Sequence, residues 1–230
     1  MKLDEFLSNL YKALDNPSCY LQGGFGQRLW VPDWYNKNYP WNKTNAKIIK
    51  DHSTTDPKTY GFDCVCLIKA ALWGFSADPG KEYGGAKYES NGVPDITVSA
   101  FASSCADYST DFSKDLDRGE LVFYDLSGSH IGVYIGDGRV IESTPAWKCG
   151  VQITMLPGRP NPDKLPVRTW YGHGHTKYID YSQPEPVNPW EAAYKILSDR
   201  FAALESENIQ ITNEVSSLQA KIERIREVCG

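Results

Sequence analysis

The segment TYGFDCVCLIKAALWGF, residues 59–75, predicts a buried helix that begins at a cysteine. Asp63 is a favoured N-cap residue, which makes Cys64 the first helical residue, and the apolar run continues to about Gly74. A thiolate at this position lies at the positive end of the helix dipole, which lowers the pKa of a cysteine. The backbone N–H of Cys64 has no partner within the helix and is free to stabilise an oxyanion. Cys64 is therefore a candidate nucleophile.

The second cysteine of this segment, Cys66, has a different expected environment. Each residue turns a helix by about 100°, so Cys66 points away from Cys64 and shares a face with Ala70 and Trp73. We expect a small buried side chain there. The six cysteines of the chain include no CxxC pair, which argues against a zinc ribbon or a dense disulfide framework.

Composition limits the class of protein. The chain has 230 residues, of which 41% are hydrophobic and 23% charged, as in globular proteins that bury a core without disulfides. The formal net charge of −5 and the absence of any basic run longer than a pair argue against nucleic-acid binding. No segment approaches the ~18 apolar residues of a membrane span. Residues 1–17 have apolar side chains at helical spacing interrupted by charges, which predicts an amphipathic helix and no secretion signal.

Helical patterns come before strand patterns in residues 1–183. A second helix is expected over residues 93–108, with Pro94 at its start. Strand patterns follow in residues 119–126, 129–136, 139–144, 151–156 and 176–181. Helices followed by an antiparallel sheet make an α+β domain.

The predicted hairpin SHIGVYIGDGRVIES, residues 129–143, carries His130 and Glu142. A loop with an even number of residues would place Glu142 on the apolar face of Val133, whereas an odd loop places it opposite Gly132 and on the face of His130. Burying an unpaired carboxylate is costly, so we expect the odd register. Glu142 then lies within reach of His130 and can fix the tautomer of its imidazole.

These segments, in this order, resemble the papain-like cell-wall cysteine hydrolases of the NlpC-type and CHAP families. YLQGGFG (20–26) resembles the Tyr-x-x-Gly-Gly segment of these families, and GFDCVCLI (61–68) stands at their Asp-Cys-Ser-Gly-Leu motif. GELVFYDL (119–126) and the hairpin resemble their histidine segment, and TPAW (144–147) is especially similar to peptidoglycan hydrolases of phages that infect Gram-positive bacteria. The similarity covers roughly residues 15–182.

The resemblance implies a papain-like catalytic domain with a Cys-His-Glu triad. Cys64 would be the nucleophile, His130 the base and Glu142 the residue that orients the imidazole. Tyr20, Asp63 and Trp147 would bind substrate. The implied reaction is cleavage of an amide bond in the stem peptide of peptidoglycan through an acyl-enzyme, without a metal or other cofactor. The expected place of action is the bacterial cell wall, reached from the host cytoplasm through a holin or as part of a phage particle.

The sequence departs from these families at three places. Val65 and Cys66 replace the Ser and Gly that follow the nucleophile, and the Asp-Ser pair helps some relatives to bind a free amine of the stem peptide. Glu142 stands where many NlpC-type members carry His, although CHAP domains use an acid there. Residues 30–56 form an insertion between Tyr20 and Cys64.

Two other functions remain open. The chain could be a wall-binding or assembly protein without catalysis, although such a protein would be expected to have lost Cys64 or His130. It could instead be a zinc amidase that uses His173 and His175, which share a face if they lie on one strand.

The last part of the sequence differs in composition. Residues 184–189 carry three prolines and predict a linker. Residues 190–230 carry an unbroken heptad and predict a coiled-coil helix, with these a and d positions: Tyr194, Phe201, Asn208, Val215, Ile222 and Cys229 at a; Trp190, Leu197, Leu204, Ile211, Leu218 and Ile225 at d. Parallel pairing through residues 190–229 predicts a homo-oligomer, most simply a dimer, because Asn208 then meets its own copy. The alternative is an amphipathic helix packed on the first domain.

Overall fold

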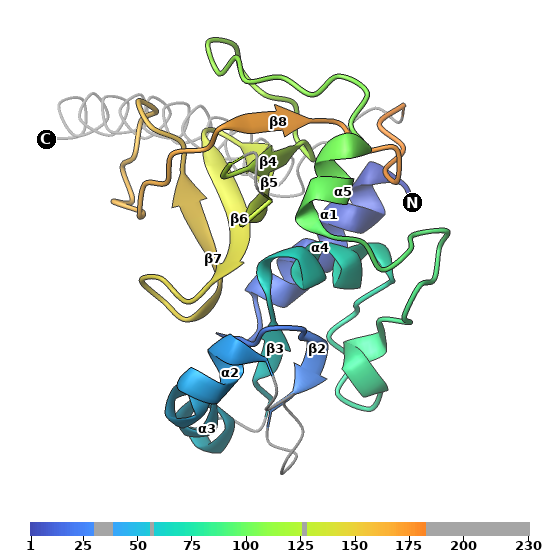
Figure 1. Ribbon diagram of the computed structural model, residues 1–230, viewed down its shortest axis with the longest axis vertical. Helices are drawn as coiled ribbons and strands as arrows, with labels where there is room; N and C mark the ends of the chain where they lie inside the picture. The colour runs from blue at the N-terminus through green and yellow to red at the C-terminus, as the bar shows by residue number, and fades with distance from the viewer. Residues whose placement is uncertain (30–38, 56–57, 126–127, 183–230) are drawn as a thin grey trace, which may run out of the picture. The chain divides into compact units, whose positions relative to one another are not determined.

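The computed structural model describes residues 1–29, 39–55, 58–125 and 128–182 (Figure 1). The chain divides into two units, Met1–Gln183 and Pro184–Gly230. The predicted linker and the predicted coiled coil therefore lie outside the described residues. Within the described part, no helix is both long and apolar enough to cross a membrane.

The first unit combines two sheets with helices, which confirms the predicted α+β class. The helices are α1 (Leu3–Leu14), α2 (Pro40–Thr44), α3 (Ala46–Thr55), α4 (Cys64–Leu72) and α5 (Val98–Ser103), with a short 3-10 helix, η1 (Glu82–Gly85). A three-stranded sheet has the order β1-β3-β2, with β1 (Ser18–Tyr20), β2 (Phe25–Arg28) and β3 (Tyr60–Phe62). An antiparallel sheet has the order β7-β6-β5-β4-β8, with β4 (Leu121–Phe123), β5 (Ile131–Gly136), β6 (Arg139–Thr144), β7 (Gly150–Met155) and β8 (Gly172–Gly174).

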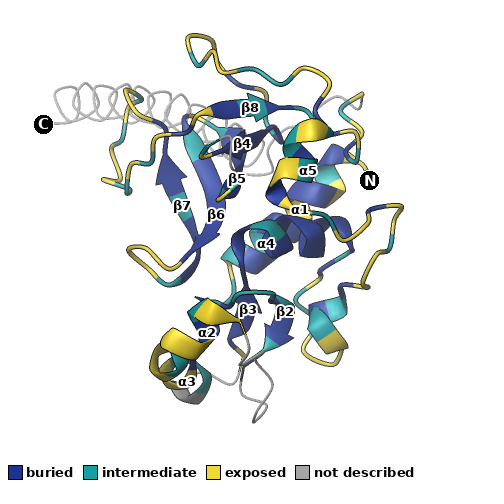
Figure 2. Cartoon of the chain, viewed as in Figure 1, coloured by how far each residue is buried: buried dark blue, intermediate teal, exposed yellow. Residues whose placement is uncertain are grey.

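Helix α4 is the centre of the core. It packs against α1 and against β5 and β6, and nearly all of its residues are buried, as its dark blue colour in Figure 2 shows. Phe6 of α1, Leu67 and Ile68 of α4 and Val133 of β5 belong to one hydrophobic cluster. This burial explains why the segment is apolar on all sides rather than amphipathic. The amphipathic helix predicted in residues 1–17 is present as α1, and it packs against α4.

Two predicted elements are wrong in their bounds. The helix expected over residues 93–108 begins at Val98, where the Thr97 hydroxyl accepts a hydrogen bond from Ala100 N, and ends at Ser103. Residues around Pro94 are held in another conformation, because Asp95 forms an ion pair with buried Lys69 and the Val93 carbonyl accepts a bond from Trp73 Nε1 at 2.8 Å.

Residues 176–181 form no strand, and their place at the sheet edge is taken by β8, which pairs with β4. Backbone bonds between Ser109 and His173 hold the other edge of β8. A Cβ at Gly172 would lie 2.1 Å from the Tyr108 hydroxyl, so a larger residue there would displace the Tyr108 side chain.

The predicted odd register of the β5–β6 hairpin is confirmed. Val133 pairs with Ile141, which places Glu142 opposite Gly132. The turn itself is a two-residue turn at Asp137-Gly138, with φ of 52° and 74°. A β-bulge between Tyr134 and Gly136 adds the residue that makes the count odd.

Part of the insertion at residues 30–56 is helical. Helices α2 and α3 lie beside the small sheet and carry much of the exposed surface in this region (Figure 2). Ile49 of α3 is fully buried and packs with Leu21 and Leu29. The insertion is thus attached to the strand that carries Tyr20.

Candidate active site

Asp63 caps helix α4, as predicted. Its Oδ1 accepts a hydrogen bond from Cys66 N at 2.6 Å, and its Oδ2 accepts one from Gly23 N at 2.7 Å. The buried carboxylate therefore holds the Gly23 segment against the start of the helix, although burial raises the pKa of Asp63. Both oxygens are engaged by the backbone, so its predicted contact with substrate remains a prediction.

Cys64 is the first residue of α4, but its thiol does not have the expected low pKa. Burial, followed by the charge of Asp63, raises the pKa of Cys64 to about 12. The backbone N–H groups of Val65, Ile131 and Cys64 itself oppose this shift. The helix dipole is therefore outweighed, because a side chain that is only 8% exposed loses the hydration of its charged form. In the free protein Cys64 is a neutral thiol.

Cys66 is buried on the other side of α4, as predicted. Burial raises the pKa of its thiol well above the usual value. The charge of Lys69 favours the thiolate but does not outweigh burial and the charge of Asp63.

His130 and Glu142 form a hydrogen-bonded pair. His130 Nε2 lies 2.5 Å from Glu142 Oε2, and Glu142 is fully buried. Thr154 Oγ1 donates to Glu142 Oε1 at 2.6 Å. Burial alone would raise the pKa of Glu142, but the bonds from His130, Arg168 and Thr154 outweigh it and lower that pKa. Nε2 of His130 is occupied by its bond to Glu142. Nδ1 is therefore the ring nitrogen that is left to accept a proton.

The two halves of the site are held together through backbone and side-chain contacts. Strand β5, which begins directly after His130, packs against α4. Ser143 Oγ, next to Glu142, donates to the Phe62 carbonyl at 2.7 Å, just before Asp63. The His130 ring also stacks on Trp170, with centroids 5.7 Å apart and planes 14° apart. These contacts place the histidine segment directly beside the start of α4.

Arg168 is a part of the site that the sequence reasoning missed. Its Nε donates to Glu142 Oε1 at 2.9 Å, and a second guanidinium nitrogen donates to Thr144 Oγ1 at 3.2 Å. Its guanidinium also lies 4.9 Å from the ring centre of Trp147. The available signal was weak, because Arg168 stands in a loop without periodicity, 26 residues from Glu142.

Trp147 and Tyr20 both lie near this set of residues. Trp147 is 56% exposed and contacts Arg168, so it presents an aromatic surface beside the site. Burial, followed by the charges of Cys64 and Asp63, raises the pKa of Tyr20. Tyr20 therefore lies near both of these residues. The Tyr20 ring packs edge-on against Trp41 of α2, with centroids 4.8 Å apart. Their predicted roles in substrate binding stay predictions.

His173 and His175 bind different partners. His173 bonds to Glu120 through Nδ1 at 2.5 Å and to the Asp111 carbonyl through Nε2 at 3.1 Å. His175 bonds to Asp107 through Nδ1 at 2.5 Å. Among the described residues, no group of potential metal ligands contains both histidines. The arrangement gives no support to a zinc amidase built on this pair.

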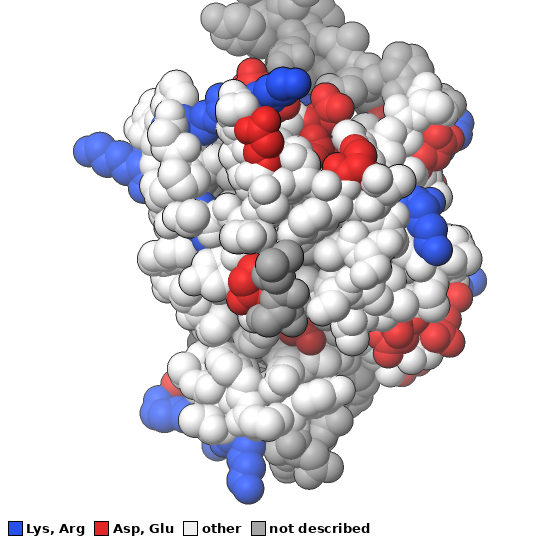
Figure 3. Space-filling model, turned by 45° about the horizontal axis from the view of Figure 1, so that its top comes forward, with Lys and Arg blue, Asp and Glu red and all other residues white. Residues whose placement is uncertain are grey.

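The surface shows no concentration of positive charge on the face drawn in Figure 3, where Lys and Arg lie scattered towards its edges. A surface cavity of about 560 Å³ lies at the turn of the β5–β6 hairpin, between Asp137 and Arg159, and contains none of the candidate site residues.

A thiol at the start of a buried helix, beside a histidine–carboxylate pair on an antiparallel hairpin, defines the papain-like class of cysteine hydrolases. The NlpC/P60 family matches residues 36–159, more than half of the sequence, and the chain belongs to this family. The predicted resemblance to NlpC-type proteins is thereby confirmed.

Solved structures with similar folds have low sequence identity. The peptidoglycan hydrolase RipB of Mycobacterium tuberculosis is 18% identical with a TM-score of 0.41, and the match covers 77% of this chain and 66% of RipB. The P60 domain of a Mycobacterium avium subspecies paratuberculosis antigen is 17% identical with a TM-score of 0.40, covering 78% of this chain and 96% of that domain.

A third similar structure is described as non-catalytic. RipD of Mycobacterium tuberculosis, a non-catalytic NlpC/p60 domain protein adapted to peptidoglycan binding, is 15% identical with a TM-score of 0.38. The match covers 74% of this chain and 96% of RipD. A search of curated proteins found no match to this chain.

Proposed function

We propose that this protein is a cysteine peptidase that hydrolyses an amide bond in the stem peptide of bacterial peptidoglycan. The observation that carries the proposal is the hydrogen-bonded His130–Glu142 pair, which lies next to the start of α4 because Ser143 Oγ donates to the Phe62 carbonyl. A thiol, a base and an orienting carboxylate are the groups that acyl transfer requires, and their presence here supports the proposal. Membership of the NlpC/P60 family supports peptidoglycan as the substrate class.

The mechanism begins from a neutral thiol. His130 Nδ1 accepts the proton of Cys64 as the sulfur attacks the carbonyl carbon, and Glu142 stabilises the imidazolium that forms. The N–H of Cys64 is the proposed donor to the oxyanion. His130 then returns the proton to the leaving amine as the C–N bond breaks, leaving a thioester.

Hydrolysis of the thioester completes the cycle. His130 removes a proton from water, the hydroxide attacks the acyl carbon, and the C–S bond breaks to restore the thiol. Every step uses the same imidazole in alternating protonation states. The sequence also predicts that such cleavage serves bacterial lysis or phage entry, and we keep that use as part of the proposal.

The experiment compares three forms of the intact chain on purified cell walls of defined stem-peptide structure. Mass spectrometry of released muropeptides identifies the bond that is cut. Cys64→Ala should lower the rate by more than about a thousandfold, while the matched variant Cys66→Ser should retain substantial activity. An active Cys64→Ala chain with an inactive Cys66→Ser chain would show that the nucleophile is wrongly assigned. EDTA should leave the chemical steps unaffected, because they use no metal, so any loss of rate should parallel a loss of folded chain.

A wall-binding protein without catalysis is the second candidate. The raised pKa of Cys64 is compatible with binding alone, because a buried neutral thiol reacts only if His130 takes its proton. Sedimentation with insoluble peptidoglycan separates the two candidates. Binding by the intact chain without release of any new peptide or amine terminus would favour this second function.

A further inference from the structure

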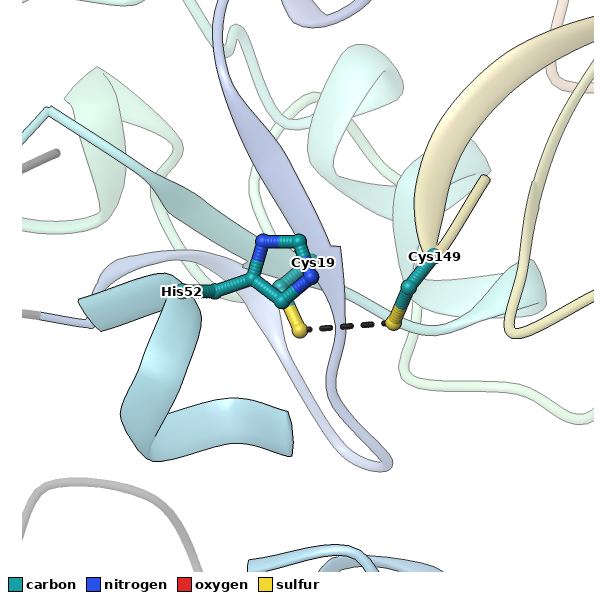
Figure 4. A group of neighbouring side chains, drawn as sticks. All are labelled: Cys19, His52 and Cys149. Atoms are coloured by element: carbon teal, nitrogen blue, oxygen red, sulfur yellow. Dashed lines mark hydrogen bonds between the residues drawn. The ribbon is translucent and has the colours of Figure 1, made fainter. Parts of the chain in front are cut away.

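Three potential metal ligands from distant parts of the chain meet beside strand β1. Cys19 lies on β1, His52 lies on α3, and Cys149 directly precedes β7 (Figure 4). The two sulfurs are 3.4 Å apart across 130 residues of sequence. One ligand atom from each of the three residues lies within 4.8 Å of the other two. None of these residues belongs to the proposed catalytic trio.

The backbone brings the two cysteines together. Val151 N donates to Ser18 Oγ at 2.8 Å, which joins the start of β7 to β1. A Cβ at Gly150 would lie 2.5 Å from the Ser18 carbonyl oxygen, so only glycine allows this approach. Cys149, the residue before Gly150, is thereby held in contact with Cys19.

The surroundings of the two cysteines fit a metal site, because Cys19 is shielded from water and Cys149 is accessible to solvent. Cys19 is fully buried in a cluster with Leu21, Leu29 and Ile49, which keeps water from one side of the sulfur. Cys149 is only partly buried, so an ion can reach the pair from solvent. Tyr20 N donates to the Cys149 sulfur at 3.4 Å, the kind of bond that supports a thiolate ligand.

The position of His52 distinguishes this cluster from a simple pair of thiols. Among the described residues, His52 is hydrogen-bonded only through its backbone, whose carbonyl accepts from Thr59 Oγ1 at 3.4 Å. Its imidazole is therefore available as a ligand. The sulfur–sulfur distance of 3.4 Å exceeds the ~2.05 Å of a disulfide. It is close to the ~3.7 Å expected between two thiolates bound to one tetrahedral ion at about 2.3 Å.

We propose that Cys19, His52 and Cys149 bind a soft divalent metal ion, with Zn²⁺ as the natural occupant. Two thiolates and an imidazole select zinc over Mg²⁺ and Ca²⁺, which prefer oxygen ligands. Water fills the fourth position on the open side of Cys149. The two thiols lose their protons on binding. The ion ties α3 of the insertion and the start of β7 to the strand that carries Tyr20, and its role is structural.

Cobalt titration of the full chain tests this site. The chain carries Cys64→Ala, so that the proposed nucleophile contributes no thiolate, and is reduced and freed of metal before Co²⁺ is added. One equivalent should produce thiolate-to-cobalt charge-transfer absorption, which Zn²⁺ then abolishes by displacement. His52→Ala and Cys149→Ser should each weaken binding by at least about tenfold. The controls Cys105→Ser and His175→Ala should leave the titration unchanged.

Thermal unfolding gives a second readout that is independent of wall cleavage. Zn²⁺ should raise the Tm of the parent chain more than the Tm of the His52→Ala chain at the same concentration, because the variant binds the ion more weakly. His52 lies on a partly exposed helix, so this variant is expected to fold even if Cys149→Ser does not. The proposal is overturned if the reduced chain shows no thiolate band, or if His52→Ala binds Co²⁺ as tightly as its parent. A freshly purified chain with a Cys19–Cys149 disulfide and no metal affinity after reduction would overturn it as well.

Discussion

Glu142 is a fully buried carboxylate whose charge is tolerated because three side chains donate to it. Thr154 and Arg168 share Oε1, and His130 lies against Oε2. An isolated carboxylate at this depth would instead be protonated, because burial disfavours its charged form. The donors reverse that tendency and hold the pKa of Glu142 below its usual 4.5. The imidazole of His130 thus faces a permanent negative charge at neutral pH.

Glu142→Gln should therefore change how stability depends on pH. A carboxyl whose pKa is lower in the folded chain than in the unfolded chain stabilises the fold fully above pH 4.5. This contribution is lost as the pH falls through the folded-state value. The difference in unfolding free energy between the parent and Glu142→Gln should be large above pH 4.5 and shrink below it. Urea unfolding at a series of acidic pH values measures this, and a difference that stays constant would contradict it.

Arg168 should act on catalysis through Glu142 rather than through the substrate. Arg168→Ala should lower kcat about 10- to 100-fold, as the loss of a supporting residue does at comparable sites. It should also move the acidic limb of the pH–rate profile to higher pH, because Glu142 loses a cationic donor. Arg168→Lys keeps the charge but cannot bond to Glu142 and Thr144 together, so it should restore part of the rate.

The matched control for Arg168 is Trp147→Ala. Trp147 contacts the guanidinium but makes no bond to Glu142, so its loss should raise KM and leave the pH profile in place. An Arg168→Ala chain with an unchanged pH profile would show that the arginine only packs against the aromatic rings.

At the level of elements, the start of α4 depends on Asp63. Asp63→Ala removes the N-cap, which costs about 1–2 kcal/mol, and also leaves the Gly23 N–H without its carboxylate partner. Asp63→Asn keeps an oxygen for Cys66 N and should lose less stability. Chemical denaturation of the parent, Asp63→Asn and Asp63→Ala chains measures the order of their stabilities. Equal denaturation midpoints for Asp63→Ala and the parent would show that the cap contributes nothing.

Helix α4 and the β5–β6 hairpin could be predicted from the sequence because their causes are local. An N-cap residue, an apolar run and the cost of burying Glu142 are all visible in one short segment. Residues 93–108 could not be placed as well, because the start of α5 is set by contacts to Lys69 and Trp73 from another element. The same holds for residues 176–181, since β8 takes the sheet edge through backbone pairing with β4 and with Ser109, which lie far away in the sequence.

In the candidate site, too, local sequence patterns predict some features and leave out those that depend on distant contacts. The His130–Glu142 pair follows from hairpin register, but the high pKa of Cys64 follows from burial, which the helix-dipole argument ignores. Arg168 lies in a loop with no pattern to mark it. Cys19, His52 and Cys149 stand too far apart in the sequence to form a zinc motif of short spacing, because the fold brings these three together from distant segments.

For the whole molecule, the heptads of residues 190–229 predict a parallel oligomer, although these residues lie outside the described structure. Asn208 favours two strands in register, and an antiparallel pair would place Glu207 against Glu214 and Arg200 against Lys221. Two linked catalytic units would bind a polymeric wall more tightly than one. Light scattering should give a dimer for the intact chain and a monomer for a chain ending at Ser182. A monomeric intact chain, or an oligomer that survives truncation, would contradict this prediction.

The two ends of the first unit are paired, and this has a consequence for how the chain folds during synthesis. Leu3 N donates to the Asp180 carbonyl at 3.2 Å, and Lys2 forms a β-bridge with Asp180. The first turn of α1 therefore cannot reach its final place until nearly the whole unit has left the ribosome. Until then the apolar face of α1 has only part of its packing surface, and contacts so distant in sequence form slowly. The pairing of Lys2 with Asp180 should therefore be among the last contacts of this unit to form.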